Sequence, residues 1–284
     1  MSDLTATTVP GARAGLPWGQ WWSQLRAIVR LELRKGFRRS FGLLLLALMP
    51  PFIAAMHMIK AVRDTSDIAG ATQVFAGLIY QAFTLRIVIF LACVLIFGNL
   101  IRRETLDRSL HYYFLSPVRR ELLVVAKYVT GLIVSFGLFG TTTVLAFVLT
   151  YLPYDSTAVS QFLFHGPGLG HLASYLLVTF LACLGYGAVF LFFGFFFKSP
   201  AMPALVVFGW EGIHFLLPPL LKEISVIHYL QSLCPVPVSE GPLAMLSDAP
   251  APWVSIVGLC ALAVVLVAVS AWKIRRMEIT YEEA

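Results

Sequence analysis

Residues 253–272 read WVSIVGLCALAVVLVAVSAW, a run of 20 residues without a charged side chain. A helix needs about 20 apolar residues to cross the hydrocarbon core of a bilayer, and unpaired backbone groups exclude most other structures from lipid. The run therefore predicts a membrane-spanning helix. The whole chain agrees, because 58% of its residues are hydrophobic, 13% are charged and its mean hydropathy is +0.81. Soluble proteins average about 45–50% apolar and about 25% charged residues, so we predict an all-α integral membrane protein.

Five further apolar runs precede this one, which makes a bundle of six predicted spans. They cover residues 41–59, about 74–101, about 122–152, 171–197 and 201–221. The first is predicted to break or bend at Pro50-Pro51, and a tight turn is predicted at Lys198-Ser199-Pro200. The runs leave no room for a soluble enzyme domain of the usual size of about 100–150 residues. Any soluble catalytic step is therefore expected in another chain.

The basic residues predict how these spans are oriented, because cytoplasmic loops carry an excess of Lys and Arg. All of the 21 Lys and Arg residues except Lys60, Arg63, Arg86 and Lys222 fall on one side of the six-span topology. We therefore expect a multi-pass protein of the plasma (inner) membrane with both termini in the cytoplasm. Its net charge of +6 follows from this topology and from attraction to anionic lipids, without a nucleic-acid partner.

Residues outside the spans divide into two tails and an amphipathic helix. Residues 1–17 lack the apolar stretch of a signal peptide and are predicted to be a mobile tail, and residues 273–284 form a cytoplasmic tail. Over residues 18–40, one helical face is aromatic and aliphatic and a second carries arginines. The first face holds Trp18, Trp22, Leu25 and Val29, and the second holds Arg26, Arg30, Arg34 and Arg38. This pattern is typical of a helix lying in the membrane interface.

Two roles for the 18–40 helix stay open. It is either a simple anchor or an elbow that also faces a cytoplasmic partner. In the second case, Glu32 is the lone acid among its bases.

The segment 102–121 interrupts the apolar runs with dense charge. Its apolar positions predict a short amphipathic helix, and Pro117 disfavours helix at Ser116 while Ser116 caps a second helix. A helix, a break and a second helix suit a rigid corner that receives force from a soluble partner. The alternative is a cytoplasmic loop that only fixes topology through its positive charge.

Ionisable residues inside the predicted spans are functional candidates, because a charge at the bilayer centre costs at least about 2.5–3.5 kcal/mol. Arg86 and Glu211 stand out, and His214 lies one turn past Glu211. We expect Arg86 and Glu211 either to pair across the bundle or to line a pathway, where Arg86 meets an anionic headgroup. In the alternative reading, Arg86 extends to the outer interface and Glu211 holds a structural hydrogen bond.

Small residues recur on the third apolar run, where Gly131 and Ser135, and Gly137 and Thr141, stand four positions apart. Residues four apart share one helical face, and small side chains let a neighbouring helix approach closely. We therefore expect both pairs to mark helix packing.

Cofactor sites are not predicted in this chain. No stretch matches the phosphate-binding pattern G-x-x-x-x-G-K-[ST]. Residues 165–171, HGPGLGH, are glycine-rich but lack the Lys, and they are predicted to form an outer turn. Their two histidines predict no metal site, since two ligands seldom suffice. The four cysteines are isolated, which indicates neither a disulfide framework nor a zinc site.

The residues around the 102–121 segment resemble the ABC type-2 permeases, the membrane subunits of ATP-binding-cassette exporters. The resemblance rests on Glu104 after the second span, the sequence LSPVRR over residues 115–120, and Lys127 at the opening of the third span. Residues 31–40, before the first span, are also similar to the family. Together with the number and spacing of the spans, the similarity covers nearly the whole chain.

The resemblance implies a permease domain over residues 41–272 and a coupling helix within 102–121. The implied ATPase-coupling residues are Glu104, Asp107, Arg108, Tyr112, Ser116, Pro117, Arg119 and Arg120. Residues 218–252 would form short re-entrant helices near the outer face, although a surface loop also fits. A second permease subunit, as a homodimer, and two copies of an ATPase subunit are the implied partners, and ATP and Mg would bind the ATPase.

The expected function is therefore that of an ABC exporter permease, driven by ATP hydrolysis in a separate subunit and embedded among membrane lipids. The alternatives are an intramembrane enzyme and a membrane scaffold without transport. An enzyme would need paired catalytic groups at membrane depth, and Glu211 with His214 is a poor substitute for them.

Overall fold

The computed structural model describes residues 18–36, 41–61, 67–100, 120–197, 199–213, 218–222, 225–238 and 250–275. All regular elements in these stretches are helices. Five helical stretches among them are long and apolar enough to cross a membrane, which confirms the predicted all-α membrane class. The tail 1–17, the segment 101–119 and residues 276–284 lie outside the described residues.

The five long helices correspond to five of the six predicted spans. They are α2 (Phe41–Ala61), the continuous helix of α3 (Ile68–Val74), η1 (Phe75–Ile89) and α4 (Phe90–Phe97), then α7 (Arg120–Tyr151), α9 (Gly168–Gly194) and α13 (Pro252–Arg275). Helix α2 continues through Pro50 and Pro51, so the predicted break does not occur, and the alternative of a bend stays a prediction. The central part of the second long helix, η1, winds as a π-helix, a form found mostly as short segments near functional sites.

The second long helix begins earlier than the apolar run predicts. It starts at Ile68 because Asp67 caps it, with the backbone N–H of Gly70 donating to Asp67 Oδ1 at 2.7 Å. A capping carboxylate satisfies an N–H group that has no partner inside the helix and opposes the positive end of the helix dipole. Polar residues near position 67 therefore start the helix, although hydropathy places its start near residue 74.

The fifth predicted span is not a long helix in the described residues. Helix α10 (Ala201–Gly212) has 12 residues, and Ile213 leaves the helical conformation. A helix of this length rises about 18 Å, whereas the hydrocarbon core is about 30 Å thick. The remaining short elements are α8 (Ser156–Ser160), η2 (Gln161–His165), α11 (Pro219–Lys222) and α12 (Val226–Ser232).

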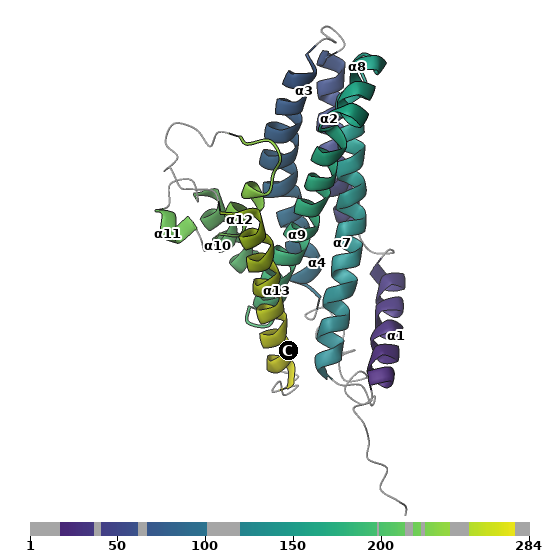
Figure 1. The fold of residues 1–284 in the computed structure, drawn as a ribbon. Helices are drawn as coiled ribbons and strands as arrows, with labels where there is room; N and C mark the ends of the chain where they lie inside the picture. Colours follow the sequence, from purple (N-terminus) through teal and green to yellow (C-terminus); the bar gives the residue numbers. More distant parts are fainter. Residues whose placement is uncertain are drawn as a thin grey trace, which may run out of the picture.

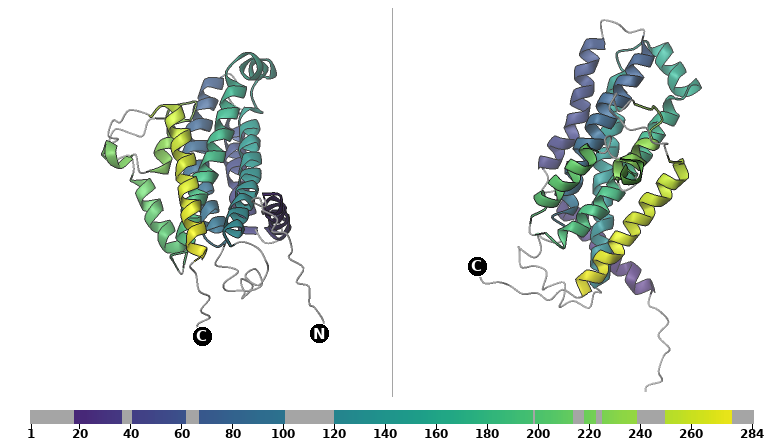
Figure 2. Two further views of the ribbon diagram at one scale, coloured as in Figure 1. Left: turned by 60° about the horizontal axis from the view of Figure 1, so that its bottom comes forward. Right: turned by 90° about the vertical axis from the view of Figure 1, so that its left-hand side faces the viewer.

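The long helices pack side by side, and the amphipathic helix α1 (Trp18–Gly36) lies at one end of them (Figure 1). We call this the α1 end, where α1, the first turn of α7 and the last turn of α13 lie together. Helices α3 and α8 lie at the opposite end. In the left view of Figure 2, α1 is seen end-on while α13 is seen from its side, so α1 crosses the long helices steeply.

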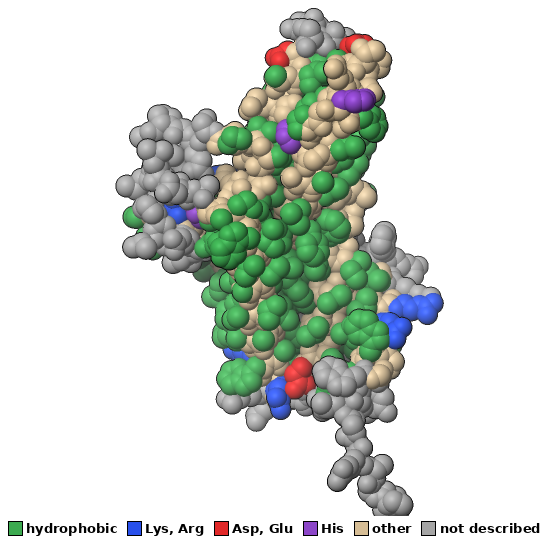
Figure 3. Space-filling model, viewed as in Figure 1, with side chains coloured by type: hydrophobic (Ala, Val, Ile, Leu, Met, Phe, Trp, Pro, Cys, Tyr) green, Lys and Arg blue, Asp and Glu red, His purple; other side chains and the backbone are tan. Residues whose placement is uncertain are grey.

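On the face that Figure 3 shows, apolar side chains gather mainly over the middle of the long helices and toward the α1 end, and most charged side chains visible there lie toward the two ends. The helix Ile68–Phe97 and α9 are the most buried of the five long helices. Tyr80 of η1 joins these two, because its hydroxyl donates to the Tyr175 carbonyl at 2.7 Å and lies 2.9 Å from the Thr179 hydroxyl. They form the centre of the bundle.

A buried ring fills the space between three helices at Phe97. A Cβ atom on Gly131 of α7 would lie 2.7 Å from Phe97 Cε1, and one on Gly187 of α9 would lie 2.8 Å from Phe97 Cζ. Phe97 itself is 1% exposed. Close packing therefore requires a glycine at position 131, as the small-residue pattern predicts. The neighbour that approaches it most closely is the aromatic ring of Phe97.

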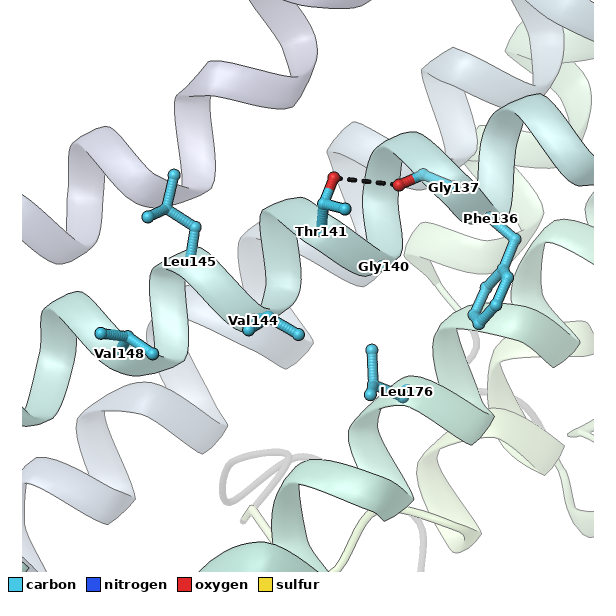
Figure 4. Close-up of a pocket in the computed structure, with 8 residues that line it drawn as sticks. All are labelled: Phe136, Gly137, Gly140, Thr141, Val144, Leu145, Val148 and Leu176. Atoms are coloured by element: carbon cyan, nitrogen blue, oxygen red, sulfur yellow. Dashed lines mark hydrogen bonds between the residues drawn. The ribbon is translucent and has the colours of Figure 1, made fainter.

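The second pair of small residues on α7 does not mark close packing. A Cβ atom on Gly137 would meet nothing within 4 Å, and the Thr141 hydroxyl donates back to the Gly137 carbonyl at 2.9 Å. Both residues line an open apolar groove of about 460 Å³ (Figure 4). The other lining residues are Phe136, Gly140, Val144, Leu145 and Val148 of α7, and Leu176 of α9. The packing prediction is wrong for Gly137.

These two glycines make a matched pair for a stability test. Gly131→Val is expected to lower the free energy of unfolding by about 1–3 kcal/mol, because overpacking a full core displaces its neighbours. Gly137→Val makes the same chemical change on the same helix in open space, so it is expected to cost far less. Denaturant unfolding in detergent micelles measures both. Equal losses for the two variants would contradict the packing around Phe97.

Candidate functional site

Helix α1 is held against the beginning of α7 by apolar side chains. Leu25, Ile28 and Val29 of α1 pack against Leu123 and Ala126 of α7. This contact includes two of the residues on the predicted apolar face. Trp22 from the same predicted face is instead 58% exposed, and the guanidinium carbon of Arg26 lies 5.6 Å from the centroid of its ring.

The predicted arginine stripe lies partly within the described residues. Arg26 and Arg30 are exposed on α1, while Trp18 and Arg34 belong to the helix. Arg38 lies outside the described residues. The exposed positions of Arg26 and Arg30 leave that side of α1 accessible. Their interaction with headgroups or with a partner stays a prediction.

An ion pair joins α1 to α7 beneath this apolar contact. Lys127 Nζ lies 3.3 Å from Glu32 Oε1, and the two side chains are only 2% and 15% exposed. A buried charge is tolerated in proteins when an opposite charge and hydrogen bonds compensate it. The lone acid of α1 is therefore turned toward α7.

A second ion pair joins α7 to α13. Arg275 Nε lies 2.9 Å from Glu121 Oε1, with side chains that are 64% and 34% exposed. Glu121 lies in the first turn of α7 and Arg275 in the last turn of α13, where each charge also opposes the helix dipole. Next to Arg275, Lys273 Nζ lies 3.4 Å from the Phe196 ring centroid, which ties α13 to the end of α9.

The predicted coupling segment leads directly into this part of α7. Seven of its proposed residues lie outside the described residues, and they are Glu104, Asp107, Arg108, Tyr112, Ser116, Pro117 and Arg119. Arg120 is the first residue of α7. Glu121, which pairs with Arg275, therefore directly follows the last basic residue of the predicted segment. The coupling roles stay predictions.

The other candidate group is a buried carboxylate at the end of α10. Glu211 is 9% exposed and accepts three hydrogen bonds. The Ser225 hydroxyl donates to Oε2 at 2.6 Å, the Val226 N–H donates to Oε1 at 3.0 Å, and the Ile227 N–H donates to Oε2 at 3.2 Å. Glu211 thus caps the first turn of α12 and joins α10 to it.

Arg86 lies on η1, and it attracts the Glu211 carboxylate electrostatically. The third member of the predicted set, His214, lies outside the described residues. Whether Arg86 and Glu211 line a pathway or act as a functional pair stays a prediction. The structure does show the three hydrogen-bond donors of Glu211, which are the Ser225 hydroxyl and the N–H groups of Val226 and Ile227.

The segment that Glu211 caps is docked onto the centre of the bundle. Val226, Ile227 and Leu230 of α12 are buried. The Gln81 side-chain amide of η1 donates to the Val236 carbonyl at 2.9 Å, and the hydroxyls of Ser232 and Ser255 lie 2.8 Å apart. Glu211 therefore connects α10, through α12, to η1 and α13.

Sequence reasoning missed Glu121, Arg275 and Ser225. Glu121 and Arg275 carry a signal, since each is the charged residue that favours its own helix end. Ser225 carries a weaker one, as a serine directly before the start of α12. These signals do not indicate which residue each of the three contacts, because the contacting residue lies on another helix.

The described part of the chain therefore forms a multi-pass membrane protein whose characteristic polar contacts join one helix to another. The four cysteines are free thiols, and no cluster of three or more His, Cys, Asp or Glu side chains occurs in the described ranges.

The chain belongs to the ABC-2 transporter family. The family model described as ABC-2 family transporter protein matches residues 28–210, which run from α1 to the last turn of α10. No curated protein and no solved structure matches the chain. Membership makes the chain the membrane subunit of an ABC transporter, a class that associates with an ABC ATPase subunit.

Proposed function

We propose that this chain is the permease subunit of an ABC exporter, moving a substrate across the plasma (inner) membrane with energy from ATP hydrolysis in a separate subunit. The family match over residues 28–210 carries this proposal. Two ATPase subunits bind ATP and Mg, two copies of this chain form a homodimer around the pathway, and membrane lipids surround them. The chain itself holds no cofactor.

The proposed topology has six spans with both termini in the cytoplasm. Support comes from the direction of the helices, since α9 and α13 both end toward the α1 end of the bundle (Figures 1 and 2). The chain between them must return across the bundle. Helix α10 begins this return, and α11 and α12 follow within the proposed re-entrant segment 218–252. The predominance of Lys and Arg on one side of this topology supports a cytoplasmic position for the α1 end.

Within this topology, α1 lies in the membrane interface and residues 102–121 form the coupling helix. The steep crossing of α1 over the long helices supports the first role. The second role is supported by the position of the segment in the chain, directly before α7. The first turns of α7 form ion pairs with α1 and α13. The eight coupling residues named from the family resemblance are proposed to contact the ATPase.

Co-purification with an ABC ATPase tests the proposal. The native chain, purified in mild detergent from its own membranes, is expected to bring an ABC ATPase with it, identified by peptide mass and by ATP hydrolysis. Glu104→Arg is expected to abolish that association, because it reverses an acidic charge that is proposed to contact the partner. Asp155→Arg makes the same reversal on an exposed residue before α8, at the opposite end, and is expected to leave the association intact.

Each result bears on a different part of the proposal. The absence of any ABC ATPase with the native chain would overturn the permease function. Retained association in Glu104→Arg and in a variant with Ser116 and Pro117 both changed to Ala would overturn the coupling segment alone.

A further inference from the structure

The winding of η1 decides which of its residues face residues 225–238, which we call the α12 region. We infer that the π form of η1 brings three of its residues into one row that holds the α12 region, so that the winding of this helix controls how the region is attached to the bundle. The inference goes beyond the proposed function and does not rest on it, because every contact that it uses lies within this chain.

Two of the three residues contact the end of the α12 region. A Cβ atom on Gly77 would lie 3.6 Å from Val238 Cγ1, so the open side of this glycine faces Val238. The Gln81 side-chain amide donates to the Val236 carbonyl at 2.9 Å. Gly77 and Gln81 therefore stand on the same side of η1, toward the α12 region.

The third residue, Arg86, acts at the start of the α12 region through Glu211. Arg86 attracts the Glu211 carboxylate, and that carboxylate accepts hydrogen bonds from the N–H groups of Val226 and Ile227. The row on η1 therefore holds the α12 region near both of its ends, with Arg86 and Gln81 as positioning residues.

An α-helix could not bring these three residues to one side. At about 100° per residue, Gly77 and Arg86 would stand about 180° apart, and Gln81 and Arg86 about 140° apart. In a π-helix the backbone hydrogen bonds join residues five positions apart, so residues four or five apart lie above one another. Rewinding η1 to the α form at its present length would therefore turn Arg86 away from Glu211.

Burial along η1 follows the spacing of a π-helix. A row of residues five positions apart is at most 1% exposed, and it consists of Phe75, Tyr80, Leu85 and Phe90. The accessible side is marked by residues four or five apart, of which the third is half-buried, and they are Leu78, Ala82, Ile87 and Leu91. The Thr84 hydroxyl donates to the Ile79 carbonyl, five positions earlier, at 2.6 Å. The packing around η1 is therefore built for π winding.

Oxygen accessibility of single nitroxide labels tests the winding, with the full chain in lipid nanodiscs. In an α-helix, Leu85 and Ile89 would lie within about 20° of the exposed Leu78, and Ile87 and Leu91 would lie on the opposite side. We expect the reverse, with labels at Ile87→Cys and Leu91→Cys nearly as accessible as at Leu78→Cys, and labels at Leu85→Cys and Ile89→Cys much less so. Accessible labels at 85 and 89 beside protected ones at 87 and 91 would overturn the inference.

The labelled chains carry Ala in place of Cys234 and Cys260, which are the two native cysteines that are partly exposed. Cys93 and Cys183 are buried and stay in place.

Changes of one residue at the exposed Ala82 test the attachment. Deleting Ala82 leaves Arg86 four positions after Gln81, a spacing that one α turn keeps on one side, so amide exchange at Val226 and Ile227 is expected to stay native. Inserting one Ala after Ala82 moves Arg86 out of the row. Exchange at both amides is then expected to rise by about tenfold, near the effect of losing one hydrogen bond.

Deletion of Val264 is the matched control, because Val264 is 69% exposed in the middle of α13, which is wound as an α-helix. That deletion turns the rest of α13 by about 100° and moves the buried Ser270 and Ile274 out of place, so it is expected to destabilise the chain. An Ala82 deletion as damaging as the Val264 deletion would overturn the inference. So would native exchange at Val226 and Ile227 in the insertion variant.

Discussion

Replacing Glu211 by Leu is expected to lower the free energy of unfolding by about 4.5 kcal/mol or more, because a hydrogen bond to a charged group contributes about 1.5–3 kcal/mol and this carboxylate accepts three. The loss also leaves the N–H groups of Val226 and Ile227 without an acceptor in a buried place. Buried donors without partners add the cost of removing them from water. The change therefore affects α12 before it affects any other helix.

A graded series of variants separates the contributions at this site. Ser225→Ala removes one donor and is expected to cost about 1–2 kcal/mol, near the value for a single capping interaction. Glu211→Gln keeps an acceptor oxygen and is expected to fall between Ser225→Ala and Glu211→Leu. Denaturant unfolding in micelles gives the stabilities, and amide hydrogen exchange reports Val226 and Ile227 directly. A fully stable Glu211→Leu variant with unchanged exchange there would contradict the cap.

Charge exchange with Arg86 distinguishes the cap from a simple ion pair. If Glu211 acted only as the partner of Arg86, the double variant Arg86→Glu with Glu211→Arg would recover what each single variant loses. Arginine offers donors and no acceptor, so at position 211 it meets the N–H groups of α12 without bonding to them. The double variant is therefore expected to stay as unstable as Glu211→Arg, and its recovery would favour the ion-pair hypothesis.

The spans were predictable because each is decided by its own residues. The run at 253–272 coincides with the core of α13, and α7 and α9 begin within three residues of their predicted starts. Hydropathy placed the start of the second span too late because the capping Asp67 is polar. It also predicted one span from α10 onward to residue 221, although α10 ends at Gly212. At Asp67 a hydrogen bond from a backbone N–H to a side chain, rather than apolar length, decides where the helix begins.

The candidate site was less predictable because its contacts join distant parts of the chain. Glu32 is noticeable as the only acid among bases, and Lys127 as a charge at the start of an apolar run. Periodicity tells which face of one helix is apolar, but not which neighbour that face meets. The pairing of these residues across 95 positions, and of Glu211 with Ser225, depends on how the helices pack.

Replacing Lys127 by Met is expected to lower the free energy of unfolding by about 3–5 kcal/mol, the usual cost of removing one member of a buried ion pair. Methionine is similar in size and fits the same space, so the loss reflects the broken Glu32–Lys127 pair. Glu32→Met alone is expected to cost a similar amount, since it removes the other member of the same buried pair.

The double variant Glu32→Met with Lys127→Met is expected to regain most of this stability, because apolar side chains of similar volume often replace a buried ion pair without loss. The exposed pair offers the contrast. Glu121→Gln with Arg275→Gln is expected to change stability by only about 0.2–1 kcal/mol, as surface ion pairs do. Unfolding in micelles measures all of these variants. If Lys127→Met were as mild as the Glu121 and Arg275 changes, the buried pair would not be what fixes α1 to α7, and the apolar packing of Leu25, Ile28 and Val29 against α7 would hold α1 in place.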